Sequence, residues 1–171
     1  MGELFQRRKK DRRLVLTLPA QAAVLLRQII VELGEMFSAP TPGAVSDRLF
    51  PRAYLDPTEE AAEEQWTALV HPELLRQRLE GLDELLRTLD GGVTKGKRTQ
   101  VTLSPDNVNL WLGVLNDARL AFGTRLDITD DTNIWYSPPD DPLAAERAAY
   151  AWLTTLQGLL VDTMLGTLPD T

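Results

Sequence analysis

Apolar residues recur at helical spacing along most of the chain. In residues 20–37 they fall three or four positions apart, at Ala22, Leu25, Leu26, Ile29, Ile30 and Leu33. This spacing puts them on one face of a helix. Similar patterns predict helices over residues 57–69, 71–90, 105–126 and 143–165, and a short helix over 44–49.

Capping residues mark where these helices begin. Asp56 and Ser104 each precede a proline, and proline suits the first turn of a helix because its missing N–H would be unpaired there anyway. Pro72 follows His71 inside a longer apolar stretch, so the same reasoning predicts that a new helix starts there. The stretch from 57 to 90 is therefore predicted as two helices, separated near Leu69.

Two short runs of β-branched and apolar residues, 14–18 and 99–103, are typical of strands. We expect them to pair with each other, because a lone strand leaves its backbone N–H and C=O groups unbonded. The glycine-rich residues 91–97 before the second run are expected to form a flexible basic turn. The predicted fold class is mainly α, a single-domain helical bundle of about six helices with a small two-stranded β-ribbon.

Charge divides the chain unevenly. The net charge of the 171 residues is −7, yet residues 1–13 hold six basic and two acidic residues, whereas the other 158 hold 12 basic and 23 acidic ones. A chain of this length ordinarily makes one domain. We therefore predict a basic N-terminal arm, residues 1–13, attached to a single α-helical domain, residues 14–171.

The basic arm has two interpretations. It is either a solvated, solubilising tail or a contact strip for nucleic acid or an acidic partner, made of Arg7, Arg8, Lys9, Lys10, Arg12 and Arg13. The acidic remainder repels phosphates, whose neutralisation by Lys and Arg supplies most of the affinity for nucleic acid. Direct DNA binding is therefore expected to be weak and to reside in the arm.

The residue types of common catalytic and metal sites are missing. The chain has no cysteine and one histidine, His71, which we expect at a helix start. Nitrogen–sulfur metal sites and thiol chemistry are thereby excluded. Gly91–Arg98 approaches a phosphate-binding loop, but Arg98 stands where that motif needs a hydroxyl, and residues 127–133 lack the glycine and glutamate of a calcium loop. We expect a protein that is not an enzyme and binds no metal or cofactor.

Membrane and export signals are also missing from the sequence. The charged N-terminus is not followed by the apolar stretch of a secretory signal. The longest uncharged segments, 14–26 and 148–161, are too short to span a bilayer. We expect a cytoplasmic protein without a membrane partner.

A polar cluster interrupts the helix predicted over 105–126. It consists of Asn116, Asp117, Arg119 and Arg125 among apolar neighbours. Because buried polar groups must be paired, the four residues either form a structural network with the last helix or face a partner.

The aromatic residues divide into two groups. Trp111 and Trp152 fall on apolar helix stripes and are expected in the core. Trp135 and Tyr136 lie in an acidic, proline-rich loop, where an exposed aromatic pair would be a contact for a partner.

Three segments resemble one known family. They are Leu115–Leu126, reading LNDARLAFGTRL, Leu49–Tyr54 before an acidic helix, and Tyr150–Gln157 in the last helix. Their order and spacing are similar to those of an actinobacterial family, formerly an uncharacterised-domain family, that takes its name from the oxidative stress transcriptional regulator AosR. The resemblance extends over nearly the whole chain.

The resemblance implies a cytoplasmic, non-enzymatic regulator of transcription under oxidative stress, acting with a protein partner such as a sigma factor or RNA polymerase. Family members are also encoded near a Clp-protease adaptor, so an interaction or adaptor protein linked to Clp-type proteolysis is the alternative. Redox sensing in proteins usually uses a low-pKa thiol, which this sequence does not contain. Amphipathic helices and an acidic surface also allow a homodimer.

Overall fold

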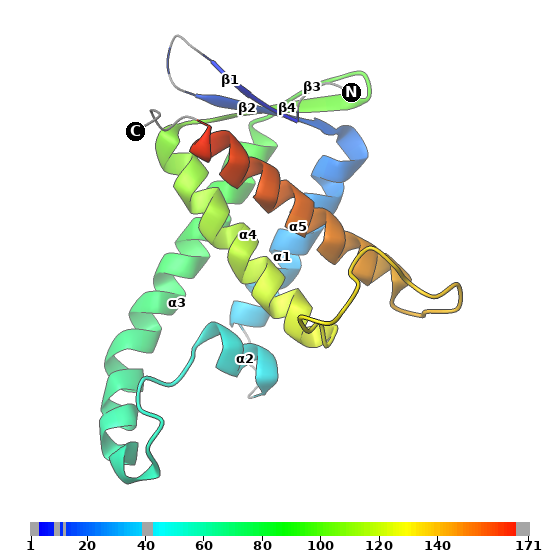
Figure 1. Cartoon of the computed structure of the whole chain (residues 1–171). Helices are drawn as coiled ribbons and strands as arrows, with labels where there is room; N and C mark the ends of the chain where they lie inside the picture. The colour runs from blue at the N-terminus through cyan, green and yellow to red at the C-terminus, as the bar shows by residue number, and fades with distance from the viewer. Residues whose placement is uncertain (1–3, 9–10, 12, 39–42, 167–171) are drawn as a thin grey trace.

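A four-stranded antiparallel sheet caps one end of a set of helices (Figure 1). The computed structural model describes residues 4–8, 11, 13–38 and 43–166. Over these residues the helices are α1 (Ala20–Ser38), α2 (Ala44–Leu49), α3 (Glu60–Asp90), α4 (Pro105–Arg125) and α5 (Ala144–Leu165), with a 3₁₀ turn, η1 (Pro57–Glu59), before α3. The strands are β1 (Phe5–Arg7), β2 (Leu14–Pro19), β3 (Val93–Lys95) and β4 (Arg98–Leu103). The predicted class, mainly α, is confirmed.

The central pair of the sheet is the predicted ribbon. Strands β2 and β4 are antiparallel, with Leu14 opposite Leu103 and Pro19 opposite Arg98. Alternate side chains of both strands are buried against the helices, because successive residues of a strand point to opposite faces of the sheet. The pairing of the two sequence-predicted strands is therefore confirmed.

Two further strands correct the predicted two-stranded ribbon, since the sheet order is β1-β2-β4-β3. Strand β1 places Phe5 in the core, so part of the predicted arm belongs to the sheet. Strand β3 replaces part of the flexible turn expected at 91–97, because Gly96, with φ of 59°, allows the chain to reverse into β4. Both strands have three residues, too few for a period-2 pattern to show.

Helix α3 corrects the two helices predicted over 57–90. It runs unbroken through Pro72, so the described part of the chain has five α-helices where about six were expected. One body-facing stripe continues on both sides of the proline, since Glu63, Thr67, His71, Arg78 and Leu82 recur at helical spacing. Pro72 and Ala68 are both exposed, so water can satisfy the Ala68 carbonyl that loses its helical donor.

Helix α4 is the centre of the packing and contacts α2, α3 and α5. Trp111 is fully buried there, and its indole Nε1–H donates a hydrogen bond to Thr88 Oγ1 on α3 at 2.8 Å. Trp152 on α5 is half-buried against the same core. The prediction that both tryptophans belong to the core is confirmed fully for Trp111 and partly for Trp152.

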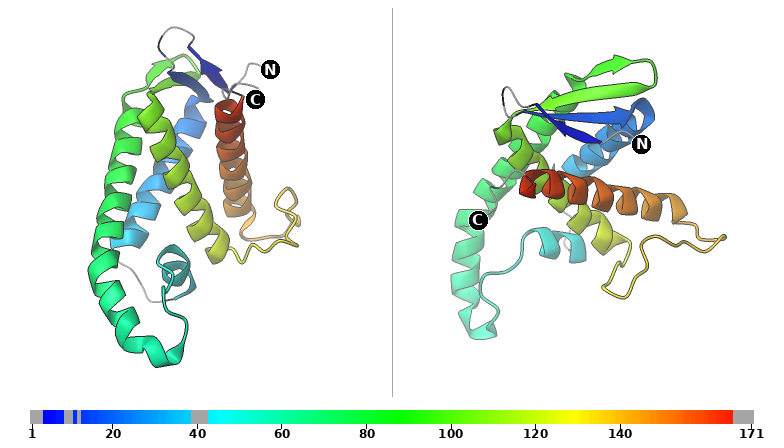
Figure 2. Two further views of the ribbon diagram at one scale, coloured as in Figure 1. Left: turned by 60° about the vertical axis from the view of Figure 1, so that its left-hand side comes forward. Right: turned by 45° about the horizontal axis from the view of Figure 1, so that its top comes forward.

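The end of the molecule opposite the sheet is built from two projecting pieces (Figures 1 and 2). One is the start of α3 with the loop before it, and the other is the loop between α4 and α5. We call this region, residues 51–70 and 127–143, the sheet-distal end. Among the described residues, no helix is both long and apolar enough to cross a membrane.

Candidate functional site

The loop before α3 is fastened to that helix by one carboxylate. Glu63 Oε2 accepts hydrogen bonds from the backbone N–H groups of Ala53 at 3.0 Å and Tyr54 at 2.8 Å, and Oε1 accepts one from Thr67 Oγ1 at 3.3 Å. The side chain is buried, and the bond from Tyr54 above all holds the pKa of the Glu63 carboxyl below its ordinary value. A buried acid thus substitutes for apolar packing at this position.

Two polar contacts complete the fastening of the same loop. Arg52 forms an ion pair with Glu60 at 2.5 Å, and Asp56 caps η1 by accepting hydrogen bonds from the N–H of Thr58 at 2.9 Å and its hydroxyl at 2.8 Å. The loop and the first turns of α3 therefore form one fixed unit, residues 51–70, which we call the distal arm.

The distal arm presents large apolar side chains to solvent. Leu55 is 83% exposed, Leu69 78% and Trp66 41%. Trp66 and Leu69 are three residues apart and share one face of α3, on the side away from Thr67 and His71. Large apolar side chains that are exposed close to one another on a helix, as Trp66 and Leu69 are, are typical of an interaction surface.

The loop between α4 and α5 presents the second apolar group. Trp135 is 69% exposed and Tyr136 64% exposed, while their backbone N–H groups bond to Asn133 at 3.0 and 3.2 Å. The loop carries five aspartates, one of which, Asp141, pairs with Arg147 at 3.0 Å. The sequence placed this aromatic pair in an acidic loop, and the structure exposes both rings.

A cavity of about 370 Å³ lies where the distal arm meets the body. Its lining is mostly apolar and comprises Phe37, Ser46, Phe50, Thr67, His71, Pro72 and Leu75. His71 lies within α3 and not at a helix start as predicted. Its ring contacts that of Phe50 in a tilted arrangement, with centroids 5.4 Å apart and an interplanar angle of 46°. Its Nε2 is buried without a hydrogen-bond partner among the described residues.

The polar cluster predicted on α4 does not form one network. Asp117 pairs with Arg78 on α3 at 3.2 Å, and burial raises the pKa of the Asp117 carboxyl while the Arg78 charge opposes that rise. Arg119 donates to Thr154 at 3.1 Å and to Gln157 at 2.7 Å on α5.

The remaining two members of the cluster lie nearer the surface. Arg125 pairs with Glu32 on α1, and Asn116 is exposed. Three of the four residues therefore join α4 to three different helices, α3, α5 and α1.

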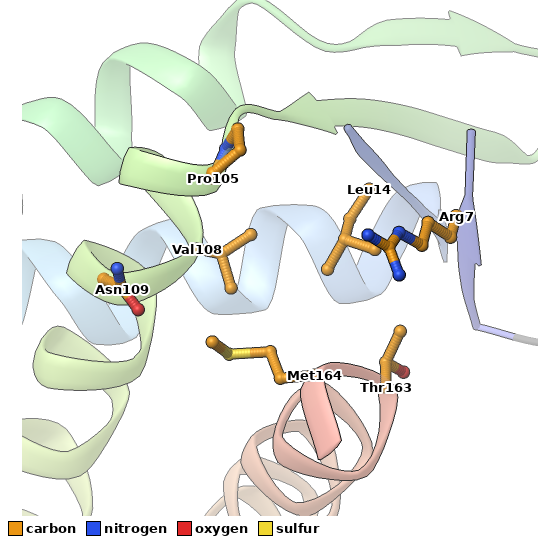
Figure 3. Close-up of a pocket in the computed structure, with 7 residues that line it drawn as sticks. All are labelled: Arg7, Leu14, Pro105, Val108, Asn109, Thr163 and Met164. Carbon is orange, nitrogen blue, oxygen red and sulfur yellow. The ribbon is translucent and has the colours of Figure 1, made fainter. Parts of the chain in front are cut away.

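The basic residues of the predicted arm occupy the opposite end of the molecule. Arg7 closes β1, and Arg8 and Arg13 flank the turn that leads to β2. Lys9, Lys10 and Arg12 lie outside the described residues. A second cavity, of about 300 Å³, lies beside β1 between the start of α4 and the end of α5, and Figure 3 shows the Arg7 guanidinium directed toward it.

The described residues hold no cluster of three or more His, Asp or Glu side chains suited to a metal ion. The sequence analysis missed Glu63, Arg78, Trp66 and Leu69. Arg78 carries the ion pair with Asp117 and also lies over the ring of Phe50 at 4.7 Å. The available signal for both Glu63 and Arg78 was their helical spacing with Leu82, which places the two charged side chains on the body-facing side of α3.

Comparison with known proteins adds a family and relatives. A family model described as a domain of unknown function (DUF2017) matches residues 2–164. The chain is 34% identical over 115 residues to the oxidative stress regulator AosR of Mycobacterium tuberculosis, which is 65% of this chain and 50% of that protein. The same figures hold for the AosR of Mycobacterium bovis. The chain spans about half the length of these curated relatives, and no solved structure matches it.

Proposed function

The chain belongs to the family described as a domain of unknown function (DUF2017), and on that premise we propose that it is a non-enzymatic regulator of the oxidative stress response. It acts by binding a protein of the transcription apparatus, a sigma factor or RNA polymerase. The names of its mycobacterial relatives support the regulatory part of the proposal.

The exposed apolar residues of the sheet-distal end carry the proposal of a protein partner. Binding energy between proteins is concentrated in a few large side chains, tryptophan and tyrosine above all. Trp66, Trp135 and Tyr136 are all exposed in this region. Each lies on a segment fixed by hydrogen bonds or helical structure, so little conformational entropy is lost when a partner binds.

The charges around these aromatic residues indicate the kind of surface that the partner offers. Aspartates and glutamates predominate in both the distal arm and the loop 127–143, so the partner presents a basic rim around an apolar centre. The cavity beside His71 can receive one side chain from that centre, and its unpaired Nε2 can bond to a polar group there.

The test uses the purified chain with the purified RNA polymerase and sigma factors of its source organism. Biolayer interferometry should detect binding of the unaltered chain. The affinity should fall at least about tenfold, roughly 1.4 kcal/mol, in each of two double variants, Trp135→Ala with Tyr136→Ala and Trp66→Ala with Leu69→Ala. Val24→Ala, at a 56% exposed position of α1, is the matched control and should bind like the unaltered chain.

Two results would contradict the proposal. Binding to polymerase that neither double variant weakens would place the partner surface elsewhere. Binding to purified Clp ATPase subunits, in place of sigma factors or polymerase, would favour the adaptor in proteolysis.

A further inference from the structure

The positive charge of the molecule is concentrated in two short segments. Nine of the 18 Lys and Arg residues, including all four lysines, lie within 7–13 and 95–98, where Asp11 is the one acidic residue. The rest of the chain holds nine basic and 24 acidic residues. In the fold the described basic residues of the two segments belong to hairpins of the sheet, Arg7, Arg8 and Arg13 to β1–β2 and Lys95, Lys97 and Arg98 to β3–β4.

The described basic residues of the two hairpins form few ion pairs with carboxylates, unlike most arginines of the rest of the chain. Outside the sheet, seven arginines form ion pairs with carboxylates, namely Arg27, Arg52, Arg76, Arg78, Arg87, Arg125 and Arg147. In the sheet, Arg13 is 3.7 Å from exposed Asp11. Over the part of the chain that the structure describes, Arg8, Lys95, Lys97 and Arg98 form no ion pair, and all four are exposed.

The register of the sheet places the two basic turns at its opposite ends. Leu14, which follows the first turn, lies opposite Leu103, and Pro19, at the other end of β2, lies opposite Arg98. Six residues of strand span about 17 Å, so the two turns are at least about that far apart. Between them Thr17, Gln100 and Thr102 are on the face turned away from the helices. Among the described residues, no other helix or strand covers this face (Figure 2).

We propose that this outer face, with a basic turn at each end, binds the phosphate backbone of double-stranded nucleic acid. The proposal does not depend on the protein partner. Nucleic-acid interfaces are more polar and more positively charged than interfaces between proteins. Besides lysine and arginine, the hydroxyl group of threonine and the amide group of glutamine also form hydrogen bonds to phosphates.

The composition of the face favours a duplex over other polyanions. Val93 is the one exposed large hydrophobic residue in the described parts of the two hairpins, so the face lacks the aromatic anchors of a protein interface and the stacking rings used for single strands. The major groove of DNA is about 12 Å wide. Two turns at least about 17 Å apart are far enough from each other to contact the phosphates on both sides of one groove.

The overall charge of −7 does not prevent this contact, because the acidic residues of the sheet-distal end are far away. Helix α3 has 31 residues, about 46 Å of helix at 1.5 Å per residue. Exposed charges are screened over about 8 Å at physiological salt. The sheet is therefore attracted to phosphates while the acidic end is screened from them, which differs from the sequence-based argument that the acidic body opposes binding.

The experiment measures fluorescence anisotropy of a labelled 30-base-pair duplex with the full chain between 50 and 200 mM salt. Lys95→Gln, Lys97→Gln and Arg98→Gln together should weaken binding at least tenfold at 50 mM salt. They should also reduce the log–log salt slope by up to about 3, since each lost phosphate contact removes about 0.9. Arg8→Gln with Arg13→Gln should act in the same direction at the other end of the sheet.

The matched control removes three positive charges from the helices, by Arg48→Gln, Arg76→Gln and Arg87→Gln, and should change affinity less than twofold. An equal loss in this control would overturn the proposal, because net charge alone would then explain binding. The absence of duplex binding at 100 μM protein and 50 mM salt would also overturn it. Binding of poly-glutamate as tight as that of the duplex would overturn it too, because it would indicate an acidic protein partner. Hairpin variants should keep their binding to RNA polymerase, so the two proposals fail separately.

Discussion

Arg78 joins three parts of the molecule through one side chain. Its guanidinium pairs with Asp117 on α4, donates a hydrogen bond to the Leu49 carbonyl at the end of α2, and lies over the Phe50 ring. A planar group with five N–H donors can make all of these contacts at once, which a lysine cannot.

We predict that Arg78→Ala lowers the free energy of unfolding by about 2–4 kcal/mol at pH 7.5 and by less at pH 4.5. Burial raises the pKa of Asp117 in the folded protein, so folding favours the protonated carboxyl. The contribution of Asp117 to the free energy of unfolding is therefore present at low pH and is lost as the pH rises through the raised pKa. Removing Arg78 raises that pKa further and leaves an unpaired charge at neutral pH. Urea denaturation at the two pH values measures the difference.

Asp117→Asn on the Arg78→Ala background is the control for this prediction. It removes the titrating group. The decrease in unfolding free energy from Asp117→Asn alone to the double variant should therefore be the same at both pH values. A loss for Arg78→Ala alone that does not change with pH would show that its packing on Phe50, and not its charge, is what stabilises the fold.

At the scale of the element, the distal arm depends on a buried acid in place of a hydrophobic contact. Glu63 accepts hydrogen bonds from the backbone N–H groups of Ala53 and Tyr54, and these bonds fasten the loop to α3. Arg52, next to these residues, is a site for trypsin that the fixed loop protects.

We predict that Glu63→Ala makes cleavage after Arg52 several-fold faster and that Glu63→Gln, which keeps one acceptor oxygen, has an intermediate effect. The pKa of Glu63 is lowered in the folded protein, so its contribution is present above the ordinary pKa and is lost as the pH falls through the lowered value. Limited trypsin digestion followed by mass spectrometry gives the rate at Arg52. Glu64→Ala, a neighbouring exposed acid, should leave that rate unchanged.

At the scale of the whole molecule, the two ends have different chemistry. The sheet end is basic and polar, whereas the sheet-distal end is acidic with exposed aromatic residues. Strand β1 contributes to the sheet end in two ways, by pairing with β2 and by leading into the basic turn that follows it. Different variants can test these two contributions separately.

We predict that deletion of residues 1–8 causes self-association. The deletion removes β1 and with it Phe5, so the edge of β2 loses its hydrogen-bonding partner, and an unpaired hydrophobic edge strand pairs readily with another chain. Arg8→Gln with Arg13→Gln keeps the strand and removes only charge, so that variant should keep the mass of the unaltered chain. Size-exclusion chromatography with light scattering distinguishes the two, and a deletion product of unchanged mass would contradict the prediction.

The sequence by itself determined the elements whose signal is local. Helices α1, α4 and α5 follow from apolar spacing and from the cap at Ser104, and the pairing of β2 with β4 follows from the need of two lone strands for hydrogen-bond partners. These features depend on neighbours within a few residues or on a single unavoidable pairing, so a single sequence is enough to predict them.

Only the tertiary structure decided the features that depend on distant parts of the chain. Helix α3 continues through Pro72 because His71 before it and Arg78 after it both contact distant parts of the chain, Phe50 and Asp117, which outweighs a local stop signal. Asp117 selects Arg78, 39 residues earlier, and β1 and β3 become strands because a sheet edge is available beside each. Burial and pairing are set by the three-dimensional neighbours of a residue, and a local pattern carries no record of them.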